Sequence, residues 1–180
     1  MANIVFKFAP AKALAAIHRM ICDQPGIDLH TLLKSCYFAD KDHLQQYGRP
    51  VFGATYRAMK FGPVPLEIYE MAKSESMWLA ELGLEEFPWV LSGFRMSLRD
   101  PAQNQAPDVS VLSGTDVECL AAAHERASKM TFDQRTRATH GYDWQAAQLG
   151  TMRYEDMLHD VEDSEPLIAT LQETSRFMRL

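Results

Sequence analysis

The chain has 180 residues, 47% of them hydrophobic, with 18 basic against 24 acidic side chains and a formal net charge of −6. This length and composition are typical of one globular domain with a core of its own. Duplex DNA and anionic membranes both attract a basic surface. We therefore expect neither nucleic acid nor a membrane as the main partner.

The cysteines and the N-terminus indicate the compartment. Cys22, Cys36 and Cys119 are widely spaced within apolar helical patterns, which predicts reduced thiols in the core and not a disulfide framework or a zinc site. There is no apolar run of about 18 residues and no signal-peptide pattern. We expect a cytoplasmic protein that needs no cofactor.

Two helices are predicted in the first quarter of the chain. Ala11–Asp23 has apolar residues at helical spacing and is followed by Gln24-Pro25-Gly26, a strong stop signal. Asp28 can cap the next helix, whose apolar face continues until Gly48-Arg49-Pro50 breaks it.

The middle of the chain combines β-like and helical patterns. Residues 51–59 are rich in aromatic and β-branched side chains, which favours a strand. Pro63 holds Gly62 in extended geometry, and Pro65 suits the first turn of a helix over 66–71. A further short helix is expected over Glu75–Leu82, with an apolar side formed by Met77, Trp78 and Leu82.

The next part alternates polar and apolar residues. Residues 89–99 show a period of two, which predicts one half-buried strand. Residues 100–107 predict a mobile loop, and 108–111 a third short strand.

The second half of the chain is helical in pattern. Ser113 with Asp116, and Thr131 with Gln134, have the spacing of capping boxes that open helices. Further helices are expected over 142–148, 154–160 and 166–180. The whole pattern predicts a mainly α chain with a small antiparallel β-sheet, an α+β fold in a single compact domain over residues 1–180.

Catalytic and metal-binding patterns are scarce. The sequence has no phosphate-binding glycine loop, no Gly-x-Ser-x-Gly elbow and no His-Glu-x-x-His. An enzyme would have to use a pair such as His140 with Asp143, or Cys36 or Cys119 as a nucleophile, but an activated nucleophile needs an exposed site. Asp40 and His43 could share a metal, although their charged neighbours favour a solvated helix end. We predict a binding protein with no enzymatic activity and no metal.

Residues 32–71 carry the most specific pattern. In order, they contain Tyr37-Phe38-Ala39-Asp40, His43-Leu44, Tyr47-Gly48-Arg49-Pro50, Gly53, Tyr56, Ala58-Met59-Lys60, Gly62-Pro63-Val64-Pro65 and Tyr69. This block resembles the Panacea domain, also called the phage-associated GepA-like or SocA-like antitoxin family. A second block, 112–144, is similar in Leu112-Ser113, Thr139-His140 and Trp144.

The resemblance implies an antitoxin of a toxin–antitoxin system that binds its cognate toxin directly. For a SocA-like member it further implies a proteolytic adaptor, which delivers a SocB-like, replication-blocking toxin to the ClpXP protease. Stable sequestration without proteolysis is the alternative. Autoregulation of an operon is disfavoured by the acidic charge and by the lack of a helix-turn-helix pattern. The sequence does not distinguish a monomer from a homodimer.

The two motif loops could form a rigid platform for the partner. Arg49, Tyr56, Arg57 and Lys60 would offer the donors and aromatic surface that interfaces favour. In the competing interpretation, Asp40 pairs with Arg49 or Lys60 inside the fold and these residues only stabilise it. The candidate partner-binding residues are Asp40, His43, Arg49, Tyr56, Arg57, Lys60, Gly62, Pro63, Pro65 and Tyr69.

Two further predictions concern the rest of the chain. His140 and Trp144, one turn apart, are expected to lock the last helices onto the core. An adaptor also needs a second surface for the protease. The loop near Asn104 and the C-terminal segment with Phe177, Met178 and Leu180 are the candidates.

Overall fold

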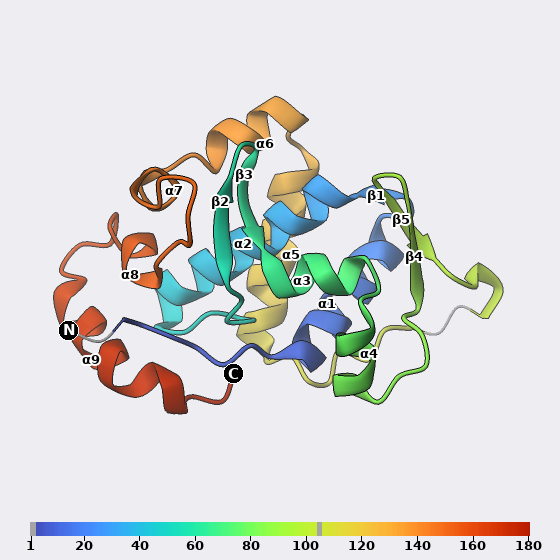
Figure 1. Ribbon diagram of the computed structural model, residues 1–180, viewed down its shortest axis with the longest axis horizontal. Helices are drawn as coiled ribbons and strands as arrows, with labels where there is room; N and C mark the ends of the chain where they lie inside the picture. The colour runs from blue at the N-terminus through green and yellow to red at the C-terminus, as the bar shows by residue number, and fades with distance from the viewer. Residues whose placement is uncertain (1–2, 104–105) are drawn as a thin grey trace.

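The computed structural model describes residues 3–103 and 106–180 (Figure 1). Its helices are α1 (Pro10–Asp23), α2 (Leu29–Tyr47), α3 (Leu66–Ala72), α4 (Ser76–Leu82), α5 (Gly114–Ser128), α6 (Phe132–Ala138), α7 (Tyr142–Ala146), α8 (Tyr154–Met157) and α9 (Glu165–Thr174). Its strands are β1 (Ile27–Asp28), β2 (Tyr56–Met59), β3 (Gly62–Pro65), β4 (Trp89–Ser92) and β5 (Arg95–Leu98), with short 3₁₀ turns at Pro101–Gln103 and Ser175–Phe177. The predicted α+β class is confirmed.

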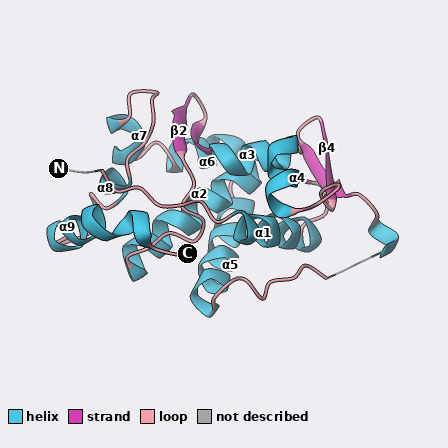
Figure 2. Ribbon diagram, turned by 60° about the horizontal axis from the view of Figure 1, so that its bottom comes forward, coloured by secondary structure: helices cyan, strands magenta, loops and turns pink. Residues whose placement is uncertain are grey.

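Helix α2 is the centre of the molecule, and the other elements surround it (Figures 1 and 2). It begins where the sequence predicts, because the Asp28 carboxylate accepts a hydrogen bond from the backbone N–H of Thr31 at 2.9 Å. It ends at Gly48, whose φ of 71° is a left-handed conformation that glycine adopts without strain. Helix α5 packs along α2.

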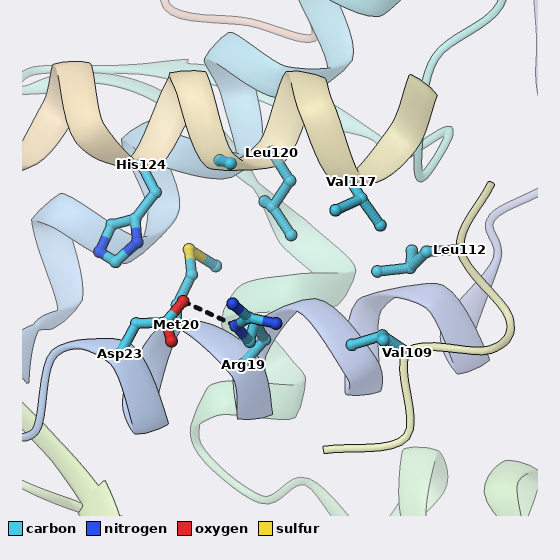
Figure 3. Close-up of a pocket in the computed structure, with 9 residues that line it drawn as sticks. Arg19, Met20, Asp23, Val109, Leu112, Val117, Leu120 and His124 are labelled. Carbon is cyan, nitrogen blue, oxygen red and sulfur yellow. Dashed lines mark hydrogen bonds and ion pairs between the residues drawn. The ribbon is translucent and has the colours of Figure 1, made fainter. Parts of the chain in front are cut away.

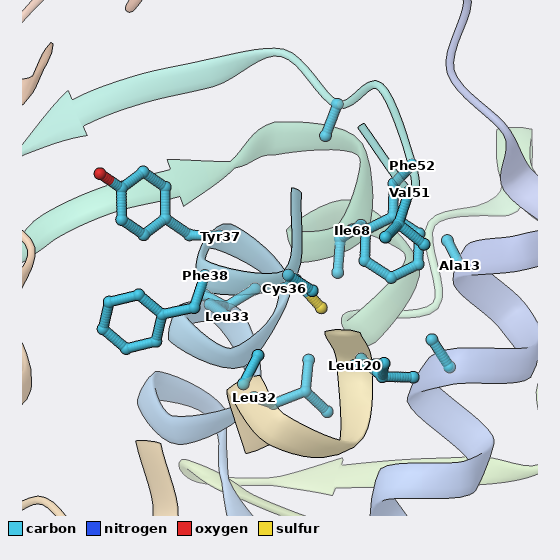
Figure 4. Packing of buried hydrophobic residues seen from close by; sticks show 14 of the residues in the cluster. Ala13, Leu32, Leu33, Cys36, Tyr37, Phe38, Val51, Phe52, Ile68 and Leu120 are labelled. Atoms are coloured by element: carbon cyan, nitrogen blue, oxygen red, sulfur yellow. The ribbon is translucent and has the colours of Figure 1, made fainter. Parts of the chain in front are cut away.

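One hydrophobic core runs between α1, α2, α3 and α5 (Figure 4). Leu32 and Cys36 of α2 are fully buried in it. Phe52 and Ile68 reach it from the following segments and are equally buried. Burying each of these large side chains contributes about 1.5–3 kcal/mol, so the core fixes the positions of the segments that surround α2.

The strands form two sheets where the sequence predicts one. In the first sheet, β5 lies between β1 and β4, and all pairs are antiparallel. The single strand predicted over 89–99 is wrong at its centre, because Gly93 takes a φ of 61° and turns the chain into a hairpin. The predicted strand over 108–111 is also wrong, since β1 supplies the third strand.

The second sheet is the β2–β3 hairpin. Its register pairs Tyr56 with Pro65 and Met59 with Gly62. The strand predicted over 51–59 is irregular in its first part. There the backbone N–H of Phe52 donates to the Asp40 carboxylate at 2.6 Å and not to a neighbouring strand. The outer edge of β2 is covered by residues 150–152, where the N–H of Ala58 donates to Gly150 and the N–H of Met152 donates to Tyr56.

Two other predictions are wrong, and a third falls partly outside the described residues. Met77 was expected on the apolar side of α4 but is 60% exposed. The last helix ends at Thr174, before the predicted end. The loop predicted to be mobile contains a 3₁₀ turn at Pro101–Gln103, and its residues 104–105 lie outside the described part of the chain. Among the described residues, no helix is both long and apolar enough to cross a membrane.

A buried carboxylate on α5 joins three parts of the chain. Asp116 is fully buried and accepts from Lys12 Nζ of α1 at 2.6 Å and from Arg49 Nη1, just after α2, at 2.9 Å. It also completes the predicted capping box with the backbone N–H of Ser113. Burial acts to raise the pKa of Asp116, but the hydrogen bonds from Lys12 and Ser113 and the charges of Lys12 and Arg49 lower it overall. The carboxylate therefore stays charged.

Replacing Asp116 with Ala should lower the free energy of unfolding by about 3–5 kcal/mol, because Lys12 would remain buried without its partner. Urea denaturation followed by circular dichroism measures the change. The matched control is Arg19→Ala, which removes a solvent-exposed pair with Asp23 and should cost less than about 1 kcal/mol. Equal losses in the two variants would show that the Asp116 network does not hold the fold together.

Candidate functional site

Asp40, the first predicted partner-binding residue, is part of the interior. Its carboxylate is fully buried and accepts from the Phe52 N–H at 2.6 Å and from Tyr56 Oη at 2.9 Å. Burial raises its pKa to about 7, against the opposing effect of these hydrogen bonds. The predicted pairing of Asp40 with Arg49 or Lys60 is wrong, since Arg49 binds Asp116 and, in the part of the chain that is described, Asp40 has no ion pair.

His43 is likewise engaged inside the fold. Its Nδ1 donates to the Arg49 carbonyl at 2.7 Å, so Nε2 is free to accept from Thr115 Oγ1 at 2.9 Å. Burial lowers its pKa, in keeping with this neutral form. Asp40 and His43 bind different partners, and the described residues contain no group of three or more potential ligands arranged around a metal.

The β2–β3 hairpin has two faces, as strand geometry requires. Tyr56 and Ala58 point into the core with Pro63 and Pro65 opposite them, and all four are buried. Tyr56 therefore cannot offer aromatic surface to a partner, which corrects that prediction. Gly62 is buried as well.

The outer residues of the hairpin remain open to solvent. Arg57 and Lys60 are exposed and Tyr69 is half-buried, so their predicted contact with a partner stays a prediction. Met59 and Val64 lie on the same face as Arg57, because residues two apart in a strand share a face and Arg57 pairs with Val64.

An apolar groove of about 370 Å³ opens beside this outer face. It lies between the hairpin, the first turns of α2, the start of α6 and the β4–β5 turn. Figure 1 shows the hairpin tip next to α6, and the rings of Phe61 and Phe132 meet there at 5.1 Å. We call it the hairpin groove, and its lining includes Leu33, Lys34, Met59, Phe61, Phe94 and Phe132.

The groove exposes large apolar side chains from three separate segments. Met59 is 46% exposed, Phe61 48%, Phe94 79% and Phe132 42%. Isolated exposed apolar residues are ordinary, but a group of them gathered around a cavity marks an interaction site. The sequence did not predict Phe94 and Phe132 as site residues, because both lie outside the first motif block, residues 32–71. The only signal in the sequence was the position of each aromatic residue, beside a turn for Phe94 and beside a helix cap for Phe132.

Basic groups lie behind the apolar lining. Lys34 is 1% exposed and its Nζ donates to the Pro63 carbonyl at 2.6 Å. Burial, together with the charge of Arg135, lowers its pKa to about 7. Burial and the charge of Lys34 lower the pKa of His30 to about 4, so His30 is neutral at pH 7.

His140 and Trp144 stack with their ring centroids 3.7 Å apart. Trp144 Nε1 donates to the Met59 carbonyl at 2.9 Å, which ties α7 to the hairpin. The structure does not pair His140 with Asp143 as a general base. The Asp143 carboxylate instead accepts from Tyr37 Oη at 2.6 Å and lies 3.3 Å from Lys41 Nζ.

The cysteines show no sign of activation. Cys36 and Cys119 are buried free thiols, and burial raises the pKa of both. They are therefore protonated at neutral pH and unsuited to nucleophilic attack.

A smaller cavity and the suggested protease surfaces lie elsewhere on the molecule. A cavity of about 50 Å³ between α1 and α5 has Met20, Leu120 and His124 in its wall, and Arg19 and Asp23 pair beside it (Figure 3). It has room for little more than water. Of the suggested protease surfaces, Asn104 lies outside the described residues, Phe177 is 78% exposed, and Met178 and Leu180 pack partly against the core.

A comparison with protein families identifies the family of this chain. The model of the family described as "Antitoxin SocA-like, Panacea domain" matches residues 32–145, more than half of the chain. This chain belongs to the SocA-like antitoxin family, the Panacea domain. No curated protein matches the chain, and no solved structure does.

The matched range contains both sequence blocks that carried the resemblance. It runs from α2 through the hairpin to α7 and so includes all six groove residues named above. It also contains Asp40 and Asp116, whereas Lys12, which pairs with Asp116, lies before it.

The buried ammonium of Lys34 should make stability depend on pH. Its pKa is about 7 in the folded chain and about 10.4 in the unfolded chain. Between these values the unfolded state binds more protons, so stability rises with pH. From pH 7 to pH 9 the wild type should gain about 2 kcal/mol relative to Lys34→Met. Urea denaturation at each pH measures this.

The control for that experiment is Lys60→Met, which removes an exposed lysine from the same region. Its stability should follow the wild-type pH profile. If Lys34→Met also follows it, Lys34 is not a buried cation in solution.

Proposed function

We propose that this Panacea domain is an antitoxin that binds its cognate toxin directly through the hairpin groove. One observation carries the proposal: four large apolar side chains from three segments stay exposed around one cavity. Covering them removes apolar surface from water, which is the main favourable contribution to most protein association. The antitoxin role itself comes from the family.

Binding, not catalysis, is the activity that this site supports. The groove has an apolar lining with a small number of polar groups, which suits recognition of a complementary surface. The polar motif residues Asp40, His43 and Arg49 form hydrogen bonds within the fold, to Phe52, to the Arg49 carbonyl and to Asp116 respectively. Their role in the proposal is to hold the hairpin and α2 in position.

The finer proposal concerns the fate of the toxin. In it, the domain acts as a proteolytic adaptor that delivers a SocB-like, replication-blocking toxin to ClpXP. Family membership supports the presence of a toxin partner. The alternative is sequestration, in which the toxin stays in a stable complex and is not degraded.

Charged substitutions in the groove should abolish neutralisation while the domain stays folded. We expect Phe61→Asp and Phe132→Asp to weaken toxin binding at least about 30-fold, because contacts at the centre of an interface often contribute 2 kcal/mol or more. Both side chains are nearly half exposed and neither belongs to the buried core, so the fold should tolerate the change. The measurements are growth rescue on co-expression with the product of the adjacent gene, and calorimetry with the purified pair.

Phe177→Asp is the matched control, because Phe177 is 78% exposed and belongs to the C-terminal turn. In calorimetry it should bind the toxin as tightly as the wild type does. Full neutralisation by both groove variants, with circular dichroism showing intact folds, would remove the groove from the toxin interface.

Delivery and sequestration predict different toxin levels. If the domain is an adaptor, the toxin should disappear only in cells that contain both this protein and ClpXP, and should accumulate when the protease is deleted. Immunoblots of the toxin with and without each component measure this. A toxin that stays abundant yet harmless in protease-positive cells would establish sequestration instead.

A further inference from the structure

Lys34 lies at the base of the hairpin groove and has unused hydrogen-bonding capacity. An ammonium group has three donors, and among the described residues Lys34 Nζ has one hydrogen-bond acceptor, the Pro63 carbonyl at 2.6 Å. No carboxylate of the described residues lies within ion-pair distance of it. A buried cation without an anionic partner is costly, and a carboxylate placed beside Lys34 would favour its charged form.

The charged side chains in the groove lining are all basic. Its lining contains Lys34 and Lys60 but no aspartate or glutamate. Arg135 stands behind the lining, where its Nε donates to His30 Nδ1 at 3.0 Å. Its nearest carboxylate, Asp28, is 3.5 Å from Nη2 and also binds Thr31. A chain of net charge −6 therefore gathers positive charge at this apolar site.

Gly62 lets the hairpin backbone lie close against the Lys34 side chain. A Cβ atom at this position would lie 3.0 Å from both Nζ and Cε of Lys34 and would also collide with Thr139 Oγ1. The φ of Gly62, 102°, is in any case strained for other residues. Glycine here allows the hairpin backbone to contact Lys34 at the base of the groove.

We propose that the hairpin groove recognises an acidic, aromatic segment of the toxin, with an apolar side chain between Met59, Phe61 and Phe132 and a neighbouring carboxylate paired with Lys34. The inference rests on the proposed function, because it names the chemistry of the toxin segment that enters the same groove. A basic segment would be repelled by Lys34 and Lys60. A neutral apolar segment would cover Lys34 and leave its charge unpaired.

The probe for this chemistry is 3-phenylpropanoate, which joins one aromatic ring to one carboxylate. Its matched neutral and cationic analogues are 3-phenylpropanamide and 3-phenylpropylamine. We expect titration of the ¹⁵N-labelled full chain, at a pH of about 6 where Lys34 is charged, to shift the amide resonances of Met59, Phe61 and Gly62. The carboxylate should bind about tenfold more tightly than the amide, and the amine should not bind.

Lys34→Met should abolish the preference for the carboxylate but keep the weak binding of the amide, whereas Lys60→Met should retain most of the preference. The comparison of the three probes on the wild-type chain does not depend on any variant folding. Equal affinity for carboxylate and amide, shifts confined to another part of the chain, or no binding by any probe would each overturn the inference.

The two proposals fail separately. If Phe61→Asp loses neutralisation but the wild type shows no preference for the carboxylate probe, the groove binds toxin and the inferred chemistry is wrong. If the probe binds as expected but groove variants still neutralise the toxin, the groove is a carboxylate site that the toxin does not use, which overturns the proposed function and the identity of the occupant.

Discussion

Helix α2 is held in place by three fully buried carboxylates, and the rest of the structure depends on that arrangement. Asp40 belongs to α2 and binds the chain that follows it. Asp116 binds groups from α1 and from the end of α2, and Asp143 accepts from Tyr37 of α2. Leaving a buried polar group unpaired costs about 1–3 kcal/mol. Displacing α5, α7 or the segment before β2 would therefore break a paired interaction at the centre of the fold.

The same arrangement determines how a partner can bind the hairpin. Tyr56 starts β2 and is fixed by Asp40, so the inner face of the hairpin is committed to the core. The outer edge of β2 is already paired with residues 150–152, and β3 contains Pro63 and Pro65, which have no N–H to offer. Addition of a partner strand is thus blocked on one edge and weakened on the other. Recognition is left to the side chains of the groove face.

Local signals in the sequence predicted the helices well, because caps act over three or four residues: Asp28, Ser113 and Thr131 each cap a helix as expected. The second strand of the hairpin was missed, since two prolines suit a loop equally well. The groove could not be predicted, because Phe94 and Phe132 meet the motif only through tertiary packing. The motif pointed to the correct region, but its most specific polar residues proved to be internal supports.

The location of the groove also bears on the adaptor proposal. An adaptor must hold its toxin and contact the protease at the same time, so the two surfaces have to be separate. The hairpin tip and α6 lie at the top of Figure 1, whereas α9 lies at the lower left. The exposed ring of Phe177 follows α9. If the domain is an adaptor, a toxin in the groove and a protease at this C-terminal segment would therefore contact different parts of the molecule.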